Sequence, residues 1–461
     1  MYKTKNEILI KSKEAIGRKF GGIDKYNRIS NMKNKGNLGQ IIEESFFNYK
    51  VNNKSEPDFI DAGVELKVTP YKLNKNGSYS AKERLVLNII DYNKEYKLEF
   101  NNSSFWKKNK ALLLMFYLHD FDIYKKDMKI TDTILFEYPE DDLEIIKKDY
   151  YIIRNKIRNG MAHQISESDT MYLAACTKGA TGESYRTQPM SDIPAKARAF
   201  SLKGSYMTSI LRKYVFGKEE NEKILKNVSL SRFPTFEEYI ENELKNYYGK
   251  TTLSLLHDFD IQSKAKNFRA MIISKMLGVR SISRSDEFIK SGMKFKTVLI
   301  NKSGKIKENM SFPHFDFKRL VQESWDDSEI RNLFESVKWV FAVFKEQDDC
   351  IEIFEKIVIW SMPQEVIDNE VKIVWEETKD VLNSGKIVKR IIINKNEKKQ
   401  FLTNFPHSTE NKIIHIRPHA KNAEDTLVLP IPDKLTGKLE YTKQCFWLDR
   451  RYILKIIKGD V

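Results

Sequence analysis

Asp58, Glu65 and Lys67 are the residues of this sequence whose types and spacing could do chemistry together. Residues 64–68 alternate apolar and polar side chains, which predicts a strand that carries Glu65 and Lys67 on one face. Asp58 precedes them, beyond a bend at residues 61–63, and could reach that face from the neighbouring segment. Two carboxylates can hold Mg²⁺ through hard oxygen ligands, and an adjacent lysine can orient a water or neutralise negative charge. The set would therefore suffice for the hydrolysis of a phosphodiester.

The same spacing has a plainer interpretation, because short motifs often occur by chance. Glu65 and Lys67 could be no more than the solvated face of an edge strand. The elements that would position them are nevertheless indicated. Asn37 can cap a helix with one apolar face, and Asn76–Gly77 predicts a hairpin turn between the first strand and a second at Leu85–Ile90. We expect an α+β class, with a mixed sheet flanked by helices.

Much of the chain occurs twice, which decides the expected architecture. The residues around Lys67 recur in order around Lys296: Phe59, Ile60 and Gly63 correspond to Phe288, Ile289 and Gly292. Further on, Phe200, Leu202, Tyr206 and Ile210 are matched by Phe446, Leu448, Tyr452 and Ile456. Ordered matches of this kind are hard to obtain by chance. We predict two tandem copies of one domain, residues 1–216 and 233–461, joined by a charge-rich linker over 217–232.

Composition describes a folded, basic chain. The 461 residues carry 79 Lys and Arg against 64 Asp and Glu, a formal net charge of +15, which favours a polyanionic partner such as nucleic acid. A mean hydropathy of -0.52 with 41% hydrophobic residues argues against a disordered chain. No secretory signal is visible, and the longest apolar run, Ala111–Leu118, is too short to span a membrane. The three cysteines lie far apart and lack a CxxC pair, which argues against a structural zinc site and against a disulfide framework and suits a reducing cytoplasm.

The segment EPDFIDAGVELKVTP at residues 56–70 resembles the active-site segment of the MutH mismatch-repair nicking enzymes and of the related GATC-cutting type II restriction endonucleases. Both groups belong to the PD-(D/E)xK nuclease superfamily. The likeness to the restriction enzymes extends to KERLVLNIIDY at 82–92, YLAACTKGA at 172–180 and RAFSLKGSYMTSILRKYV at 198–215. It implies two MutH-like copies in one chain, and a Mg²⁺-dependent endonuclease that recognises double-stranded GATC.

The resemblance also implies roles for individual residues of the first copy. Asp58 and Glu65 correspond to the metal-binding carboxylates, and Lys67 to the catalytic lysine. Glu43 corresponds to an additional acid carried on a helix, with its neighbour Glu44 as the nearest alternative.

Basic residues of the first copy are implied to contact DNA. Lys108 or Lys110 corresponds to a basic residue near the site, with a solvated lysine as the plainer alternative. Lys178 corresponds to a lysine that reads GATC in the major groove, although a lysine can equally bind a phosphate. Lys203 is expected to contact a phosphate. In the nicking enzyme, a tyrosine in the region of Ser201 helps to sense adenine methylation. This sequence has Ser201 there, so the resemblance does not imply methylation sensitivity of that kind.

The second copy looks disarmed when the repeats are aligned. Asp58, Glu65, Lys67 and Glu43 correspond there to Glu287, Lys294, Lys296 and Ile273. A lysine in place of Glu65 repels a divalent cation and favours phosphate. We therefore expect this copy to bind DNA without cutting it, and to use the basic segment at residues 415–422, with Arg417 and Lys421. His415 and His419 are expected to face DNA or solvent.

One complete set of residues per chain has a consequence for partners. A break in both strands of a palindrome needs two active sites, so transient dimerisation on DNA is expected, with the second copy as an effector. The resemblance also implies a cognate DNA methyltransferase in the host, without direct contact. The rival hypotheses are a repair-type nicking enzyme and a DNA-binding protein without catalysis.

Overall fold

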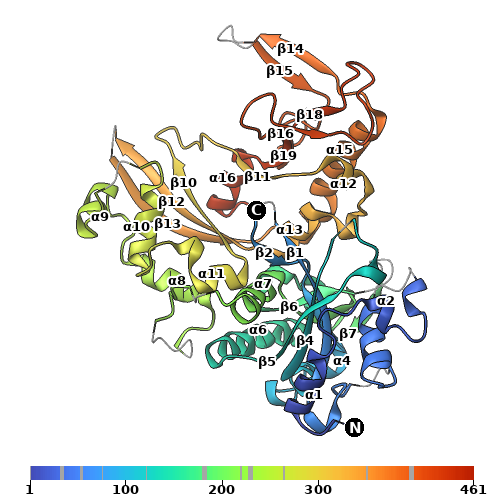
Figure 1. Ribbon diagram of the computed structural model, residues 1–461. Helices are drawn as coiled ribbons and strands as arrows, with labels where there is room; N and C mark the ends of the chain where they lie inside the picture. The colour runs from blue at the N-terminus through green and yellow to red at the C-terminus, as the bar shows by residue number, and fades with distance from the viewer. Residues whose placement is uncertain are drawn as a thin grey trace. The chain divides into compact units, whose positions relative to one another are not determined.

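The computed structural model describes residues 2–31, 36–51, 55–74, 76–120, 122–178, 184–218, 221–226, 232–262, 265–348, 351–393 and 399–461 (Figure 1). The chain forms two compact units. The first unit comprises Met1–Tyr239 with Ile282–Met293, and the second comprises Ile240–Ser281 with Lys294–Val461. Each unit is described by itself.

The main sheet of the first unit has the strand order β2-β1-β4-β5. Its strands are β1 (Glu65–Leu73), β2 (Tyr79–Ala81), β4 (Ala111–Leu118) and β5 (Ile130–Glu137). β1 runs parallel to β4, with Glu65 opposite Leu112, and β4 runs antiparallel to β5. β4 is a continuous apolar run and lies in the middle of the sheet, as expected for a strand buried on both faces. The core of this sheet packs against α1, α3 and η2 through apolar residues that include Ile8, Ile41 and Phe46.

A second sheet of the first unit is antiparallel, with the order β3-β9-β6. It consists of β3 (Leu85–Ile89), β6 (Leu173–Thr177) and β9 (Arg198–Leu202), and a two-stranded ribbon of β7 (Tyr185–Gln188) and β8 (Ser191–Lys196) lies between β6 and β9 in sequence. The predicted hairpin from β1 to Leu85–Ile90 is therefore wrong. The turn at Gly77 (φ 78°) leads into the short β2, and β3 pairs with β9, where Leu85 and Leu87 are buried.

The helices of the first unit are α1 (Lys5–Lys13), α2 (Phe20–Ile23), α3 (Asn37–Ile41), α4 (Tyr92–Glu95), α5 (Ser104–Asn109), α6 (Glu140–Arg158), α7 (Gly204–Ile210) and α11 (Asp286–Ser291), with π-helical turns at η2 (Ile42–Phe46) and η8 (Leu211–Val215). The N-cap of α3 is Gly36, so the prediction that Asn37 caps this helix is wrong. The Asn37 side chain is buried and its amide donates to the Asn31 carbonyl (3.4 Å).

α11 belongs to the second copy by sequence but packs in the first unit, against α7. The Lys290 ammonium lies 2.7 Å from Asp142 Oδ1 and 2.6 Å from Asp286 Oδ2. Ser205 Oγ donates to the Lys290 carbonyl (2.8 Å), and the Glu287 carboxylate accepts the N–H groups of residues 224 and 225. α11 is therefore fixed to the first unit by buried ionic and polar contacts.

The second unit repeats three strands of the main sheet of the first unit and all three strands of its antiparallel sheet. Strand order β10-β12-β13 pairs β10 (Lys294–Ile300) parallel to β12 (Trp339–Asp348), and β12 antiparallel to β13 (Ile351–Trp360). An antiparallel sheet has the order β11-β19-β16, from β11 (Met310–His314), β16 (Ile414–Pro418) and β19 (Gln444–Leu448). Two ribbons are formed by β14 (Lys389–Ile393) with β15 (Lys399–Thr403) and β17 (Thr426–Val428) with β18 (Glu440–Thr442).

The remaining helices are α8 (Phe236–Lys245), α9 (Thr252–Asp258), α10 (Phe268–Met276), α12 (Phe317–Gln322), α13 (Glu329–Ser336), α14 (Gln364–Val366), η12 (Ile367–Val371), α15 (Lys372–Ser384) and α16 (Arg450–Lys458). Strand pairing confirms the predicted α+β class with two tandem copies, since β1-β4-β5 and β10-β12-β13 share directions and order, as do β3-β9-β6 and β11-β19-β16. Among the helices of the described residues, none is both long and apolar enough to cross a membrane.

Candidate active site

Asp58 and Glu65 meet at the start of β1. Residues 60–62 form a single 3-10 turn, and Gly63 follows in the left-handed conformation (φ 65°), which brings the chain back so that Phe59 pairs with Val64. The Asp58 N–H donates to Glu65 Oε2 (3.1 Å), and Asp58 Oδ2 accepts the N–H of the next residue, Leu66 (3.0 Å). The two carboxylates predicted from the sequence therefore lie side by side, each tied to the other's segment.

Two lysines point at the same oxygen of Glu65. Lys67 Nζ lies 3.0 Å from Glu65 Oε1, as expected for side chains on one face of a strand, and Lys108 Nζ from α5 lies 3.6 Å from it. Glu65 is only 3% exposed, so these cations face a carboxylate with little solvent around it. Lys110 is exposed and its side chain lies along Gly63 instead. Of the two lysines considered, Lys108 is the one at the site.

Glu43 approaches the pair from η2. The pKa of Glu43 is raised to about 7, first by burial and then by the negative charges of Asp58 and Glu65. The pKa of Asp58 is raised to about 6 by burial and by Glu65, against the opposing effect of Lys67 and Lys108. Glu44 turns elsewhere: its carboxylate lies 2.6 Å from Arg28 Nε, and that hydrogen bond lowers the Glu44 pKa. Of the two neighbours, Glu43 is the one whose pKa is raised by the charges of Asp58 and Glu65.

This donor set fits a hard divalent cation. The pKa values of Asp58 and Glu43 are raised first by burial and then by the charges of neighbouring carboxylates, and a bound cation would offset both effects. Within the described ranges, no three His, Cys, Asp or Glu side chains are gathered closely enough to form a complete metal cage. Mg²⁺ does not need one, because it is usually held by one or two carboxylates, substrate phosphates and waters.

Of the two lysines predicted to contact DNA beyond the carboxylates, Lys178 is exposed and Lys203 is buried. Lys178 is exposed at the end of β6, where its N–H donates to the Ala197 carbonyl (2.7 Å), and residues 179–183 after it lie outside the described ranges. Lys203 differs from the expectation of a phosphate contact. Its side chain is buried, its ammonium donates to the Thr170 carbonyl (2.5 Å), and its charge acts on the buried Asp149. Sequence alone placed Lys203 on a surface loop, whereas it stands at the N-cap of α7 and turns inward.

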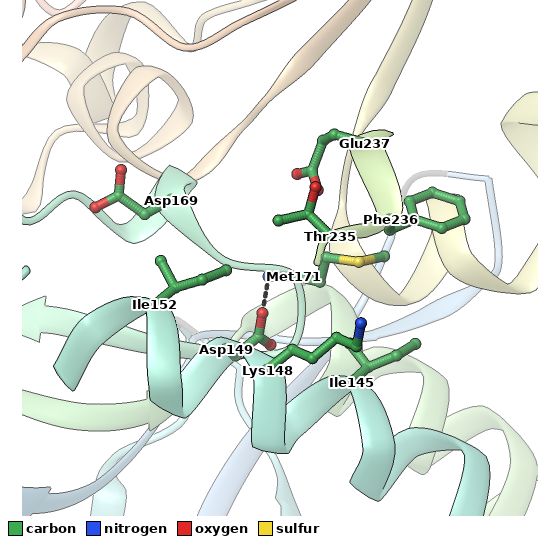
Figure 2. Close-up of a pocket in the computed structure, with 9 residues that line it drawn as sticks. All are labelled: Ile145, Lys148, Asp149, Ile152, Asp169, Met171, Thr235, Phe236 and Glu237. Atoms are coloured by element: carbon green, nitrogen blue, oxygen red, sulfur yellow. Dashed lines mark hydrogen bonds between the residues drawn. The ribbon is translucent and has the colours of Figure 1, made fainter. Parts of the chain in front are cut away.

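Asp149 lines a small cavity together with residues that include Ile145, Met171 and Phe236 (Figure 2). The cavity has a volume of about 10 Å³, which suits a single water at most. The Asp149 carboxylate accepts the N–H groups of Met171 (2.8 Å), Tyr172 (2.6 Å) and Leu173 (2.9 Å), and burial raises its pKa to about 6. Sequence reasoning missed this carboxylate. It fixes the entry to β6, at whose far end Lys178 stands.

The second unit carries lysines where the first carries its site. Lys294 and Lys296 are exposed on one face of β10, and the Lys294 pKa is lowered by partial desolvation of its ammonium and by repulsion from Lys296. Ile273, the counterpart of Glu43, is fully buried. The counterpart of Asp58, Glu287 in the first unit, is buried and accepts two backbone N–H groups.

The basic segment at residues 415–422 has some exposed side chains and some buried ones. Arg417 is exposed, with its guanidinium 5.2 Å from the Trp447 ring centre, and Lys421 is exposed. His419 is also exposed, at the edge of the same ring. The expectation that His415 faces DNA or solvent is wrong, because its side chain is fully buried beside Asp449 (3.8 Å). Burial lowers the His415 pKa to about 4, so the ring is neutral near pH 7.

Comparison with known proteins gives matches to both copies. The sequence matches the family model of the DNA mismatch repair enzyme MutH over residues 47–149, which include Asp58, Glu65 and Lys67, and again over residues 278–371. It is 37% identical over 488 positions to the type II restriction enzyme Sau3AI of Staphylococcus aureus, covering 99% of each chain. It is 29% identical over 218 positions to the DNA mismatch repair protein MutH of Shewanella woodyi, covering 45% of this chain and 91% of that protein.

Proposed function

Because this chain belongs to the MutH-related family of type II restriction endonucleases, we propose that it recognises double-stranded 5′-GATC-3′ and hydrolyses its phosphodiester bonds with Mg²⁺. The observation that carries the proposal is the meeting of Asp58, Glu65 and Lys67 at the start of β1. Two hard carboxylates and a cation at one buried point are the groups that metal-assisted phosphodiester hydrolysis requires.

Each side chain has a proposed task. Asp58 and Glu65 hold the metal, which when bound supplies a Lewis acid that stabilises charge developing on the phosphate. Lys67 and Lys108 offer their ammonium groups to that charge, since they lie 3.0 and 3.6 Å from Glu65 Oε1. Glu43, with a pKa of about 7, can accept or give up a proton at its carboxylate near neutral pH.

Sequence selection is proposed for the exposed Lys178. It leaves the end of β6 at a position that matches a lysine reading GATC in the resembling enzymes, and its ammonium can donate to guanine O6 and N7. The alternative, a phosphate contact, would add affinity without selecting a sequence.

We propose that the second copy, residues 233–461, binds DNA and acts as an effector of the first. Lys294 and Lys296 would meet phosphates where the first copy meets the metal, and the exposed Arg417 and Lys421 would add contacts. Residues 217–232 would join this copy to the catalytic copy over residues 1–216. Because one chain carries one complete set of catalytic side chains, two chains would meet transiently on DNA. A cognate methyltransferase in the same cytoplasm would protect the host.

The test incubates the full-length protein and its Glu65→Ala variant with a circular plasmid carrying several GATC sites, with Mg²⁺ and with EDTA. Discrete linear fragments that require Mg²⁺ and disappear in the variant are expected, with ends that map to GATC. Nicked circles at every protein concentration would instead favour the nicking alternative and would contradict the dimer. Binding without any cleavage by the wild type would contradict the proposal.

A further inference from the structure

Glu43 stands on an unusual turn of backbone. α3 passes directly into the π-helical turn η2, in which the Phe47 N–H donates to the Ile42 carbonyl (3.0 Å). A π-turn inserts one extra residue into a helix and is often found at functional sites. Glu43 is close enough to Asp58 and Glu65 for their charges to raise its pKa, while the next residue, Glu44, forms an ion pair with Arg28. The direction of Glu43 therefore depends on how the turn is held.

Arg28 holds this turn from the side of Glu44. Its Nε lies 2.6 Å from Glu44 Oε2, and its Nη1 donates to Gln40 Oε1 (3.2 Å). Gln40 belongs to α3 and Glu44 to η2, so one planar guanidinium spans the junction between the helix and the π-turn. A fork of this kind fixes orientation as well as distance, which a lysine could not do.

The loop that carries Arg28 is itself braced. The Asp24 carboxylate accepts the N–H groups of Tyr26 (3.2 Å) and Ile29 (2.9 Å), on either side of Arg28. The Lys25 N–H donates to Ser45 Oγ (3.1 Å), a further contact with η2. The loop that carries Arg28 is therefore held by its own hydrogen bonds, and it contacts the turn both through Lys25 and through the guanidinium.

Arg28 and Glu44 also line an open hollow of about 520 Å³, together with Tyr26, Asn48, Tyr49 and Lys50. Removal of the guanidinium would let water fill the space instead of leaving a void in the core. Loss of a partly exposed ion pair costs little stability in general, so variants at this position are expected to fold.

We propose that Arg28 is a positioning residue for DNA cleavage, which acts by holding the π-turn so that Glu43 faces Asp58 and Glu65. The inference rests on the role proposed for Glu43. Arg28 itself touches Glu44 and Gln40, and its effect on the reaction passes through the backbone of η2. Residues that orient metal-site side chains in this way typically change metal affinity or activity by about 10- to 100-fold when removed.

The test compares Arg28→Ala, Glu44→Ala, their double variant, Arg28→Lys and Glu43→Gln in the full-length protein. Single-turnover cleavage of a GATC duplex should be about 10- to 100-fold slower in Arg28→Ala. The double variant should be no slower than the single variants, because both remove one contact. Arg28→Lys should recover part of the rate, since it keeps the charge but loses the fork. Lys5→Ala, which breaks an exposed ion pair of the same length with Glu137, is the control and should be unaffected.

Two measurements separate positioning from general damage. Calorimetry without DNA should show weaker Mg²⁺ binding in Arg28→Ala, while its unfolding temperature and its DNA affinity in EDTA stay close to those of the wild type. Wild-type cleavage and Mg²⁺ affinity in Arg28→Ala, beside an impaired Glu43→Gln, would overturn this inference alone. Full activity of Glu43→Gln would instead overturn the role proposed for Glu43.

Discussion

Lys294 occupies in the second unit the register position that Glu65 occupies in the first. Each residue begins the strand that pairs in parallel with the central strand of its sheet: Glu65 lies opposite Leu112, and Lys294 lies opposite Trp339. The sheets agree in strand order and direction, so the exchange is a change of side chain at a preserved place. A cation at this place opposes the binding of a second cation.

Lys294→Ala should weaken DNA binding and reduce its salt dependence. If Lys294 neutralises one phosphate, the slope of log affinity against log salt should fall by about one. Titration of the full-length protein with duplex DNA in EDTA over a range of salt concentrations would measure this slope. Lys458→Ala, an exposed lysine in the last turn of α16, is the control. An unchanged slope in Lys294→Ala would contradict a phosphate contact.

Lys108→Ala and Lys110→Ala should differ although only one residue separates them. Lys108 Nζ lies 3.6 Å from Glu65 Oε1, so its loss should slow single-turnover cleavage by about 100-fold, the lower end of the range for an electrostatic group at an active site. Lys110 is exposed along Gly63, and its loss should change the rate by less than about threefold. Equal effects of the two variants would place the catalytic cation elsewhere.

Metal-free protein should become less stable as pH rises from about 4, the ordinary range of carboxyl pKa values, to about 7. The pKa values of Asp58 (about 6) and Glu43 (about 7) lie above those of an unfolded chain, so the folded state binds more protons over this interval. The carboxyl groups therefore contribute stability that is lost as pH rises through those values. Urea unfolding in EDTA should show a smaller loss for Glu43→Gln than for the wild type.

Mg²⁺ should reduce the same pH dependence. A bound cation favours the ionised carboxylates, so the affinity of the protein for Mg²⁺ should increase with pH over this interval. The free energy of unfolding measured with Mg²⁺ should therefore fall less with rising pH than that measured in EDTA. Identical pH profiles for the wild type and Glu43→Gln would show that Glu43 does not titrate near neutrality.

Lys203→Ala should damage folding and leave DNA contacts intact. The buried ammonium donates to the Thr170 carbonyl and offsets the buried charge of Asp149, so its loss should lower the free energy of unfolding by about 3 kcal/mol. Urea denaturation measures this change. The slope of log DNA affinity against log salt should remain that of the wild type. A lower slope would show that Lys203 contacts a phosphate after all.

The local sequence pattern predicted correctly how two side chains of the candidate site are placed. Alternation along residues 64–68 placed Glu65 and Lys67 on one face, and their 3.0 Å ion pair agrees with it. The repeat predicted two copies because it compares the sequence with itself and needs no knowledge of contacts. The choice between Glu43 and Glu44 could not be made from sequence, since it depends on a π-turn and on Arg28.

The burial of individual polar side chains was what the sequence predicted least well. Lys203 and His415 are of types that usually lie at the surface, and nothing adjacent in sequence marks them as internal. Their partners, Thr170 and Asp449, come from distant segments that only the folded chain brings together. The predicted hairpin between β1 and β3 was wrong for the same reason. β3 pairs with β9, which lies more than 100 residues further along the sequence.

The placement of α11 bears on how a duplicated gene can evolve. Residues 282–293 descend from the second repeat, yet Lys290 and Glu287 are held by Asp142 and by backbone groups of the first unit. A simple head-to-tail duplication yields copies that recombination can separate again. When a helix of one copy packs in the compact unit of the other, a break between the copies removes a structural part from that unit. Loss of the second copy would therefore be selected against even where that copy contributed nothing else.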